Sequence, residues 1–237
     1  MSLSTKFRFW GRVRIEEALN GELDFDQLDS RGVGALHWAI DNNERDLFQL
    51  ALEAGAPVNQ ATAYIEDVPL HCASYCKSPF FIDALIAHGA DIDKSDRSLI
   101  TSLHIAAEKG FLKHVRKLVA AGCSLRPLNE YKRSPLDLAF MYGRVEVIDY
   151  LVTLPEAKHR SWSDRLPLAV ERVQADVVRW LLDRGANPDR KDSEGRRPID
   201  IARRLDQRAP MSNGQRQVLS LIEQASKKEK RGKTINE

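Results

Sequence analysis

Three neighbouring side chains, His71, Cys72 and Cys76, are of the types that bind zinc. Imidazole and thiolate groups are preferred zinc ligands, and a structural zinc site usually takes four of them. No fourth ligand lies nearby in the sequence, and His71 belongs to a short motif that recurs along the chain. The sequence therefore predicts no metal site, and it predicts reduced thiols at Cys72, Cys76 and Cys123.

Motifs of the common catalytic machineries are missing from the sequence. It contains no glycine-rich phosphate loop, no G-x-S-x-G nucleophile turn and no H-E-x-x-H metal pair. The Asp and Glu residues are spread over separate parts of the chain, so their spacing forces no two carboxylates together. We therefore expect a protein that is not an enzyme and that needs no cofactor.

The motif that contains His71 recurs with a regular period. Val68-Pro69-Leu70-His71-Cys72-Ala73 has degraded copies along most of the chain, with spacings of 34, 33, 33, 30 and 33 residues. A fixed period near 33 residues with a T-P-L-H-x-A core is typical of stacked helical repeats. The leading aliphatic residues of the six copies are Leu36, Leu70, Leu103, Leu136, Leu166 and Ile199.

The third copy shows how one repeat should fold. Residues 101–110 predict a short helix, with Thr101 as its N-cap and Gly110 as its C-terminal stop. Small residues at 106 and 107 allow the next helix to approach closely. Apolar residues at three- and four-residue steps over 112–119 then predict a second amphipathic helix, packed antiparallel on the first.

These motifs closely resemble the ankyrin repeat. The family pattern is a D-x-x-G-x-T-P-L-H hairpin, two helices and a G-A-D-V-N ending. Asp29-Ser30-Arg31-Gly32 opens the first copy, Gly89-Ala90-Asp91-Ile92-Asp93 ends the second, and Asp192-Ser193-Glu194-Gly195 opens the sixth. The resemblance covers about residues 29–225 and implies an all-α ankyrin-repeat solenoid of helix–turn–helix units with β-hairpin or loop fingers.

The resemblance divides the chain into a cap, six repeats and a tail. Solenoids need atypical terminal units because an open stack would expose its core. We expect an N-terminal cap helix within 1–28 and a basic disordered tail at 226–237. The predicted repeats are 29–59, 60–93, 94–125, 126–158, 159–189 and 190–225.

The fifth repeat departs from the pattern. Pro167 occupies the position of the motif histidine, and the preceding segment 154–163 lacks the G-A-D-V-N ending. We therefore expect a nonstandard finger there, with Trp162 at its tip.

The resemblance also implies where a partner would bind. In ankyrin-repeat proteins the first helices and the fingers line a concave groove, and contacts come from fingertips and from the residue pair after the Ala-Ala of each first helix. Tyr, Trp, Met and Arg concentrate binding energy in protein interfaces. The alternative is that some of these side chains fill gaps between adjacent fingers. The predicted partner-binding residues are Tyr64, Tyr75, Tyr131, Arg133, Met141, Tyr142, Trp162 and Arg172.

Charge is distributed unevenly along the chain, although the formal net charge is only +2. Residues 1–100 hold 9 Lys and Arg against 16 Asp and Glu, whereas residues 101–237 hold 27 against 18. The basic half allows nucleic-acid binding as an alternative, but interleaved acidic residues weaken a groove that would follow phosphates. The cations concerned are Arg126, Lys132, Arg133, Lys158, Arg160, Arg165, Arg190, Lys191, Arg196 and Arg197.

The sequence therefore predicts a non-catalytic protein-binding module, an adaptor or an inhibitor, that engages another protein through its concave face and fingers. A specific version is an immunity-type inhibitor of a bacterial toxin, so the partner could be an enzyme or a toxin. The apolar runs are short and no signal peptide is recognisable, so we expect no membrane association and a cytoplasmic location. We expect the free protein to be a monomer.

Overall fold

The computed structural model describes residues 10–22, 24–155, 161–206 and 212–234. The chain forms two compact units, residues 1–136 and 137–237. The described residues contain thirteen α-helices and no strand, with one isolated antiparallel bridge between Ser95 and Thr101. The prediction of an all-α fold is confirmed. None of the described helices combines the length and the hydropathy that crossing a membrane requires.

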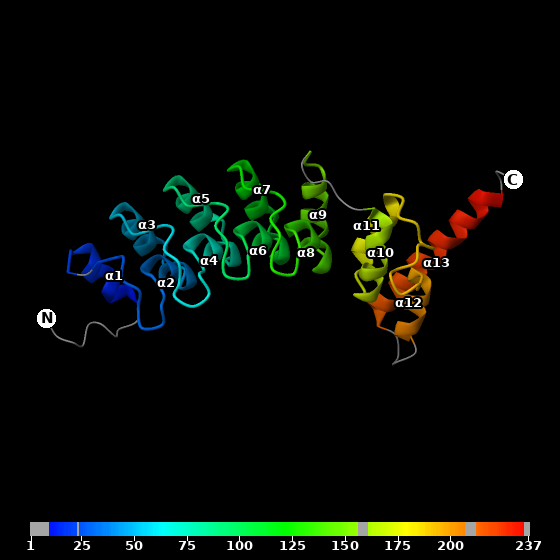
Figure 1. Cartoon of the computed structure of the whole chain (residues 1–237), viewed down its shortest axis with the longest axis horizontal. Helices are drawn as coiled ribbons and strands as arrows, with labels where there is room; N and C mark the ends of the chain where they lie inside the picture. Colours follow the sequence, from blue (N-terminus) through cyan, green and yellow to red (C-terminus); the bar gives the residue numbers. More distant parts are fainter. Residues whose placement is uncertain (1–9, 23, 156–160, 207–211, 235–237) are drawn as a thin grey trace. The chain divides into compact units, whose positions relative to one another are not determined.

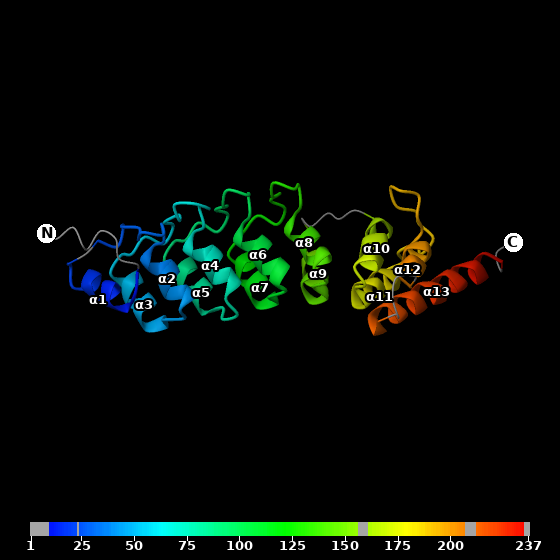
Figure 2. The ribbon, with the colours of Figure 1, turned by 90° about the horizontal axis from the view of Figure 1, so that it is seen from below.

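The first unit consists of helix pairs joined by short turns. In each pair the first helix packs on its second helix and on the first helix of the next repeat, as α4 packs on both α5 and α6. The first helices and the second helices form two parallel rows (Figures 1 and 2). Its helices are α1 (Arg12–Leu19), α2 (Ala35–Asp41), α3 (Arg45–Glu53), α4 (Pro69–Tyr75), α5 (Phe80–Ala87), α6 (Ser102–Lys109) and α7 (Leu112–Ala120).

The second unit repeats the same arrangement. Helix α10 packs on α11 and α12, and α11 packs in turn on α9 and α13. Helix α8 begins at the end of the first unit and continues into the second. The remaining helices are α8 (Pro135–Met141), α9 (Val145–Val152), α10 (Trp162–Glu171), α11 (Ala175–Asp183), α12 (Pro198–Asp206) and α13 (Asn213–Thr234).

The periodic residues form the core of each repeat. Leu36, Leu70 and Leu103 are at most 2% exposed, and the small residue Ala106 is fully buried where the neighbouring helices meet. Helix α6 ends at Gly110, whose φ of 77° is left-handed, as a C-terminal stop requires. Burial at this spacing is what the sequence pattern predicts.

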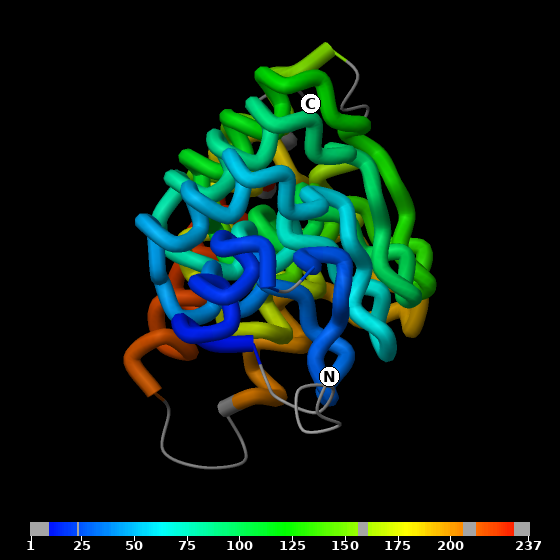
Figure 3. Tube along the Cα trace, turned by 90° about the vertical axis from the view of Figure 1, so that its left-hand side faces the viewer, coloured from blue at the N-terminus to red at the C-terminus, as the bar shows by residue number. Residues whose placement is uncertain are grey.

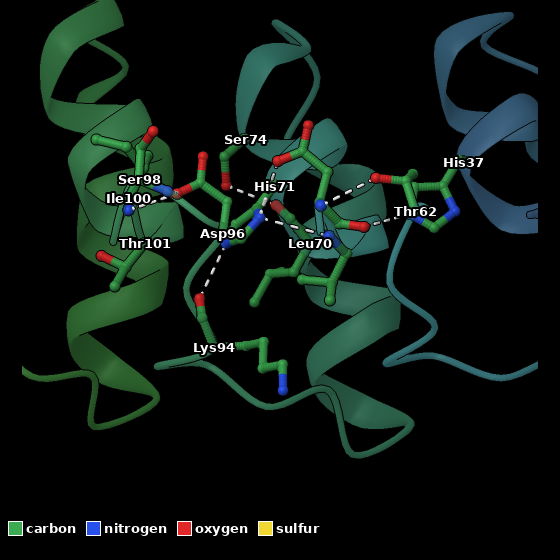
Figure 4. Close-up of polar contacts among 12 residues, drawn as sticks. His37, Thr62, Leu70, His71, Ser74, Lys94, Asp96, Ser98, Ile100 and Thr101 are labelled. Carbon is green, nitrogen blue, oxygen red and sulfur yellow. Dashed lines mark hydrogen bonds and ion pairs between the residues drawn. The ribbon is translucent and has the colours of Figure 1, made fainter. Parts of the chain in front are cut away.

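The three motif histidines brace the repeats. The Nε2 atoms of His37, His71 and His104 lie 3.0, 2.9 and 3.0 Å from backbone carbonyl oxygens in the next finger, those of Asp67, Lys94 and Arg133. On the other side of the His104 ring, Nδ1 accepts a hydrogen bond from the N–H of Thr101, the N-cap of its own helix. Figure 4 shows the equivalent contacts of His71. Each ring therefore holds the following finger, and the rings of His71 and His104 also fix the start of their own helices.

Each finger is closed by a short polar side chain. The Asp96 carboxylate accepts hydrogen bonds from the N–H groups of Ser98 and Ile100, at 2.8 and 2.7 Å (Figure 4). Asp29 and Asn129 close the neighbouring fingers in the same way. This turn places one residue per finger in the left-handed region.

Two residues at this left-handed position have different surroundings. Gly32 has a φ of 72°, and a Cβ atom there would lie 2.5 Å from Cβ of Ala63, so both backbone and space require glycine. Leu99 has a φ of 59°, yet its side chain is 51% exposed. A leucine at this φ is strained by about 1–2 kcal/mol.

Two expectations differ from the structure. Helix α13 continues through Thr234, so most of the segment predicted to be a disordered tail is helical. Trp162 is the first residue of α10 and not a fingertip. Pro167 lies within α10 at the position of the motif histidine, so the fifth repeat lacks the histidine contact to the next finger. Residues 156–160 of the irregular segment lie outside the described residues, as do residues 207–211.

We predict that His104→Ala lowers the free energy of unfolding by about 2–3 kcal/mol, because it leaves the Arg133 carbonyl and the buried Thr101 N–H without their partner. Urea unfolding followed by circular dichroism measures this change. His88→Ala is the matched control, since His88 is exposed at the end of α5. A loss for H104A no larger than that for H88A would contradict the bracing role.

A second prediction concerns acid stability. His114 is 1% exposed on α7, and burial lowers its pKa from the usual 6.5, although the nearby backbone groups of Cys76 and Ser78 act in the opposite direction. Burial lowers the pKa of His37 as well. The unfolded chain therefore binds protons that the folded chain does not, and stability falls as pH drops below about 6.5, by at most about 1.4 kcal/mol per pH unit for each histidine.

Measuring the free energy of unfolding between neutral and mildly acidic pH tests this prediction. We expect His114→Val to reduce the slope, because valine removes the buried titrating group. His88→Ala should leave the slope unchanged. An unchanged slope in H114V would show that His114 does not account for the acid sensitivity.

Candidate functional site

The exposed aromatic side chains of the first unit lie on fingers and on a first helix. Tyr64 and Tyr131 are each 67% exposed on fingers, and Tyr75 is 51% exposed at the end of α4. None of the three fills a gap in the core. The sequence placed all three on the partner-facing side, and their exposure is compatible with that prediction.

Backbone hydrogen bonds join successive fingers of the first unit. The N–H of Ala63 donates to the carbonyl of Gly32 at 3.0 Å, the N–H of Arg97 to that of Ile65 at 3.1 Å, and the N–H of Glu130 to that of Ser98 at 3.0 Å. In the view from the N-terminal end the finger loops of this unit lie one above another (Figure 3). The fingertips therefore form one continuous edge.

This finger edge carries more apolar surface than its tyrosines alone. Ile65 and Leu99 are 55% and 51% exposed, between Tyr64 on one finger and Tyr131 on another. Leu99 is not among the residues predicted from the sequence, although the sequence marks its position: Gly32 and Gly195 stand there in other copies of the finger motif.

Tyr75 lies in a negatively charged environment. Partial burial raises the pKa of its phenol, and the carboxylates of Asp67, Glu108 and Asp96 raise it further. Asp41, at the end of α2, also has a raised pKa, through partial burial and then through repulsion from Asp67, with Arg31 acting in the opposite direction. The surface between the finger edge and the first helices is therefore acidic at this end of the first unit.

Two cations of the first unit lie over its exposed tyrosines. Nζ of Lys109 is 5.1 Å from the ring centre of Tyr75, and the Arg133 guanidinium carbon is 5.4 Å from that of Tyr131. Arg133 is exposed, and its backbone carbonyl is the acceptor for His104. These contacts orient the tyrosine rings without covering them.

The second unit holds the other four predicted residues. Tyr142 is 45% exposed, and Met141 is half-buried at the end of α8. The Met141 carbonyl accepts hydrogen bonds from Nε2 of Gln174 at 2.8 Å and from Nη1 of Arg172 at 3.4 Å. Met141, Tyr142 and Arg172 thus lie where consecutive helix pairs of this unit meet.

Trp162 takes part in a cluster of aromatic rings. It is half-buried, with its ring centre 5.1 Å from that of Trp180 in an edge-to-face arrangement and 6.3 Å from that of Phe140. The Arg165 guanidinium carbon lies 4.2 Å from the Phe140 ring centre on the same cluster. Trp162 therefore stabilises the packing of α10 as well as presenting an edge to solvent.

Many cations of the basic half are engaged in ion pairs. Arg165 pairs with Asp137 at 2.8 Å, Arg196 with Asp192 at 2.8 Å, and Arg197 with Asp200 at 2.9 Å. Arg190 pairs with Asp164 at 3.3 Å. Lys158 and Arg160 lie outside the described residues. The paired arginines are less available to phosphate groups than the sequence alone indicates.

The cysteines do not form a metal site within the described part of the chain. No group of three or more His, Cys, Asp or Glu side chains there is arranged to hold a metal ion. Burial raises the pKa of the Cys72 and Cys76 thiols, and Sγ of Cys76 donates to the Ile40 carbonyl at 3.8 Å. Both thiols are free, as is Cys123.

Comparisons with known proteins agree with the repeat architecture. A family model for ankyrin repeats in three copies matches residues 70–161, and a model for a single ankyrin repeat matches residues 166–193. The crystal structure of the human ASB11 ankyrin repeat domain superposes with a TM-score of 0.67 at 23% identity, over 88% of this chain and 93% of that one. At this identity the superposition shows the fold alone.

Curated relatives match through the same region. A putative palmitoyltransferase ZDHHC13 of Danio rerio is 26% identical over 84% of this chain and 32% of its own length. The B-cell lymphoma 3 protein homolog of Mus musculus is 29% identical over 53% of this chain and 28% of its own length. The chain thus spans about a third of each of these relatives. Repeat motifs, family models and superposition agree, and the chain belongs to the ankyrin-repeat family.

Proposed function

We propose that this protein is a non-catalytic adaptor that binds another protein through its fingers and first helices. The observation that carries the proposal is the finger edge of the first unit, where backbone bonds align exposed Tyr64, Ile65, Leu99 and Tyr131. Aligned aromatic and aliphatic side chains on a rigid support are typical of protein interfaces. Ankyrin repeats are protein-interaction modules, which agrees with this assignment.

The state of the titratable side chains supports a non-catalytic role. The histidines of the motif are buried and bonded to backbone carbonyls, so their rings serve the scaffold. The raised pKa values of Cys72 and Cys76 keep both thiols protonated and hence weakly nucleophilic. The palmitoyltransferase relatives match over less than a third of their own length, so their enzymatic role is not transferred to this chain.

We propose the general role of an adaptor over that of a toxin inhibitor. Neither the relatives named above nor the solved structure is an immunity protein by name. Nucleic-acid binding is also disfavoured, because Arg165, Arg196 and Arg197 are neutralised by nearby carboxylates. A protein partner makes use of the exposed tyrosines, which a phosphate backbone would leave without a role.

We predict that replacing Tyr64, Tyr75 and Tyr131 together by alanine weakens binding of the native partner by at least about a hundredfold, since exposed interface tyrosines contribute about 1–2 kcal/mol each. The partner is first captured from the native cell with the unaltered protein and identified. Its affinity for the purified variant is then measured by calorimetry. Melting temperature and helical content should stay unchanged, because all three side chains are exposed.

Two further variants locate the surface. Met141→Ala with Tyr142→Ala and Arg172→Ala tests the second unit, while Leu50→Ala, an exposed apolar residue on α3, is the control and should bind normally. Trp162 is left intact because its removal would disturb the ring cluster. If neither multiple variant loses affinity, the proposed binding surface is wrong.

A further inference from the structure

The finger edge of the first unit borders an acidic surface that lacks matching cations. Six carboxylates lie on or beside its first three fingers, against three cations that are already close to a carboxylate, whereas the fourth finger carries Lys132 and Arg133 beside Tyr131. Arg31 pairs with Asp29 at 3.0 Å, Arg97 with Glu66 at 3.1 Å, and Lys109 lies 3.9 Å from Glu108. The carboxylates are Asp29, Asp41, Glu66, Asp67, Asp96 and Glu108.

We propose that the first unit binds an extended, basic segment of its partner protein, with apolar side chains of that segment along the finger edge and a lysine or arginine beside Asp41 and Tyr75. This inference rests on the proposed function, because it names the chemistry of the partner. It adds the sign of the partner's charge and the spacing of its apolar residues.

Asp41 is the centre of the charge argument. It is exposed at the end of α2, and the described structure gives it no ion pair or hydrogen bond. Partial burial raises the pKa of Asp41, repulsion from the Asp67 carboxylate raises it further, and Arg31 acts in the opposite direction. Asp67 already contacts the His71 ring at 3.2 Å, so Asp41 is the more open of the two carboxylates to an incoming cation.

Tyr75 provides a second contact for the same cation, because the ends of α2 and α4 are adjacent: Sγ of Cys76, the residue after Tyr75, lies 3.8 Å from the carbonyl oxygen of Ile40, the residue before Asp41. Its ring is 51% exposed, and the carboxylates of Asp67, Glu108 and Asp96 all act on it. A cation over an aromatic face is stabilised by the ring and, here, also by the surrounding negative charge. Lys109 already lies near this ring, at 5.1 Å, which shows that the position suits an ammonium group.

The finger edge determines the shape of the bound segment. Stacked helix layers are about 10 Å apart, so neighbouring fingertips repeat at about that distance. A polyproline II segment rises about 3.1 Å per residue with three residues per turn, so every third side chain faces the same way about 9 Å further on. A partner in this conformation places one apolar residue against each fingertip, with basic residues between them.

Leu99 supports a binding role for this edge. Its φ of 59° disfavours leucine, and its exposed side chain contributes little to the core. A residue that strains the backbone without packing inside the protein is best explained by contacts made outside it. Leu99 is therefore assigned to the apolar part of the docking surface, between Ile65 and Tyr131.

The test is selection of a random peptide library on the immobilised full-length chain, followed by sequencing of the enriched peptides. We expect enrichment of lysine and arginine, and of aliphatic or aromatic residues at three-residue intervals. A selected basic peptide should bind Asp41→Asn about fivefold more weakly than the unaltered chain, and raising the salt concentration should weaken it further.

Two variants complete the design. Asp46→Asn makes the same charge change on α3 and is the matched control, which should bind the peptide normally. Leu99→Gly should weaken the peptide severalfold without lowering the melting temperature, because glycine suits a φ of 59°. This combination separates a binding role for Leu99 from a structural one.

Enrichment of acidic peptides, or no enrichment over the input library, overturns the inference. Equal losses in D41N and D46N overturn the position of the cation beside Asp41. Either result leaves the proposed function intact if the triple tyrosine variant still loses the native partner. The reverse result, in which basic peptides bind at Asp41 and the native partner ignores the tyrosines, refutes the proposed surface instead.

Discussion

The rest of the first unit depends on one hydrogen bond, repeated from copy to copy. The motif histidine uses Nε2 to hold a carbonyl of the next finger, and in His104 the Nδ1 atom also receives the N–H of its own helix N-cap. Because the ring is buried, breaking either bond would leave a polar atom without water to replace it. The series from His37 through His71 to His104 therefore fixes the position of each finger relative to the repeat before it.

Where the histidine is replaced, the connection between repeats changes. Asp137 stands at the motif position of the fourth repeat and forms an ion pair with Arg165 of α10, while Asp200 in the sixth caps its own helix through the N–H of Arg197. Pro167 in the fifth can form neither contact. The last histidine bond ends at Arg133, and the boundary of the first compact unit follows directly, at residue 136. The division of the chain thus coincides with the loss of this interaction.

Buried positions were predictable from the sequence, and exposed ones were predictable only in part. The period placed Leu36, Leu70 and Leu103 in the core because burial imposes the same requirement on every copy. The role of Trp162 depends on Phe140 and Trp180, which the local sequence does not reveal. The composition of the charged segment after residue 225 predicts disorder, but α13 extends through most of it. Adding residues to an existing helix costs less free energy than starting a new helix. Leu99 was not predicted, because the strain that singles it out is a property of its backbone angle φ.

A surface built this way is ready to bind before a partner arrives. The bonds between Gly32 and Ala63, Ile65 and Arg97, and Ser98 and Glu130 hold the finger backbones in place, so binding orders few additional residues. Since these bonds use backbone atoms only, the side chains at the tips can vary without loss of the scaffold. The tips can therefore carry residues that the fold does not require, including a leucine at a position better suited to glycine.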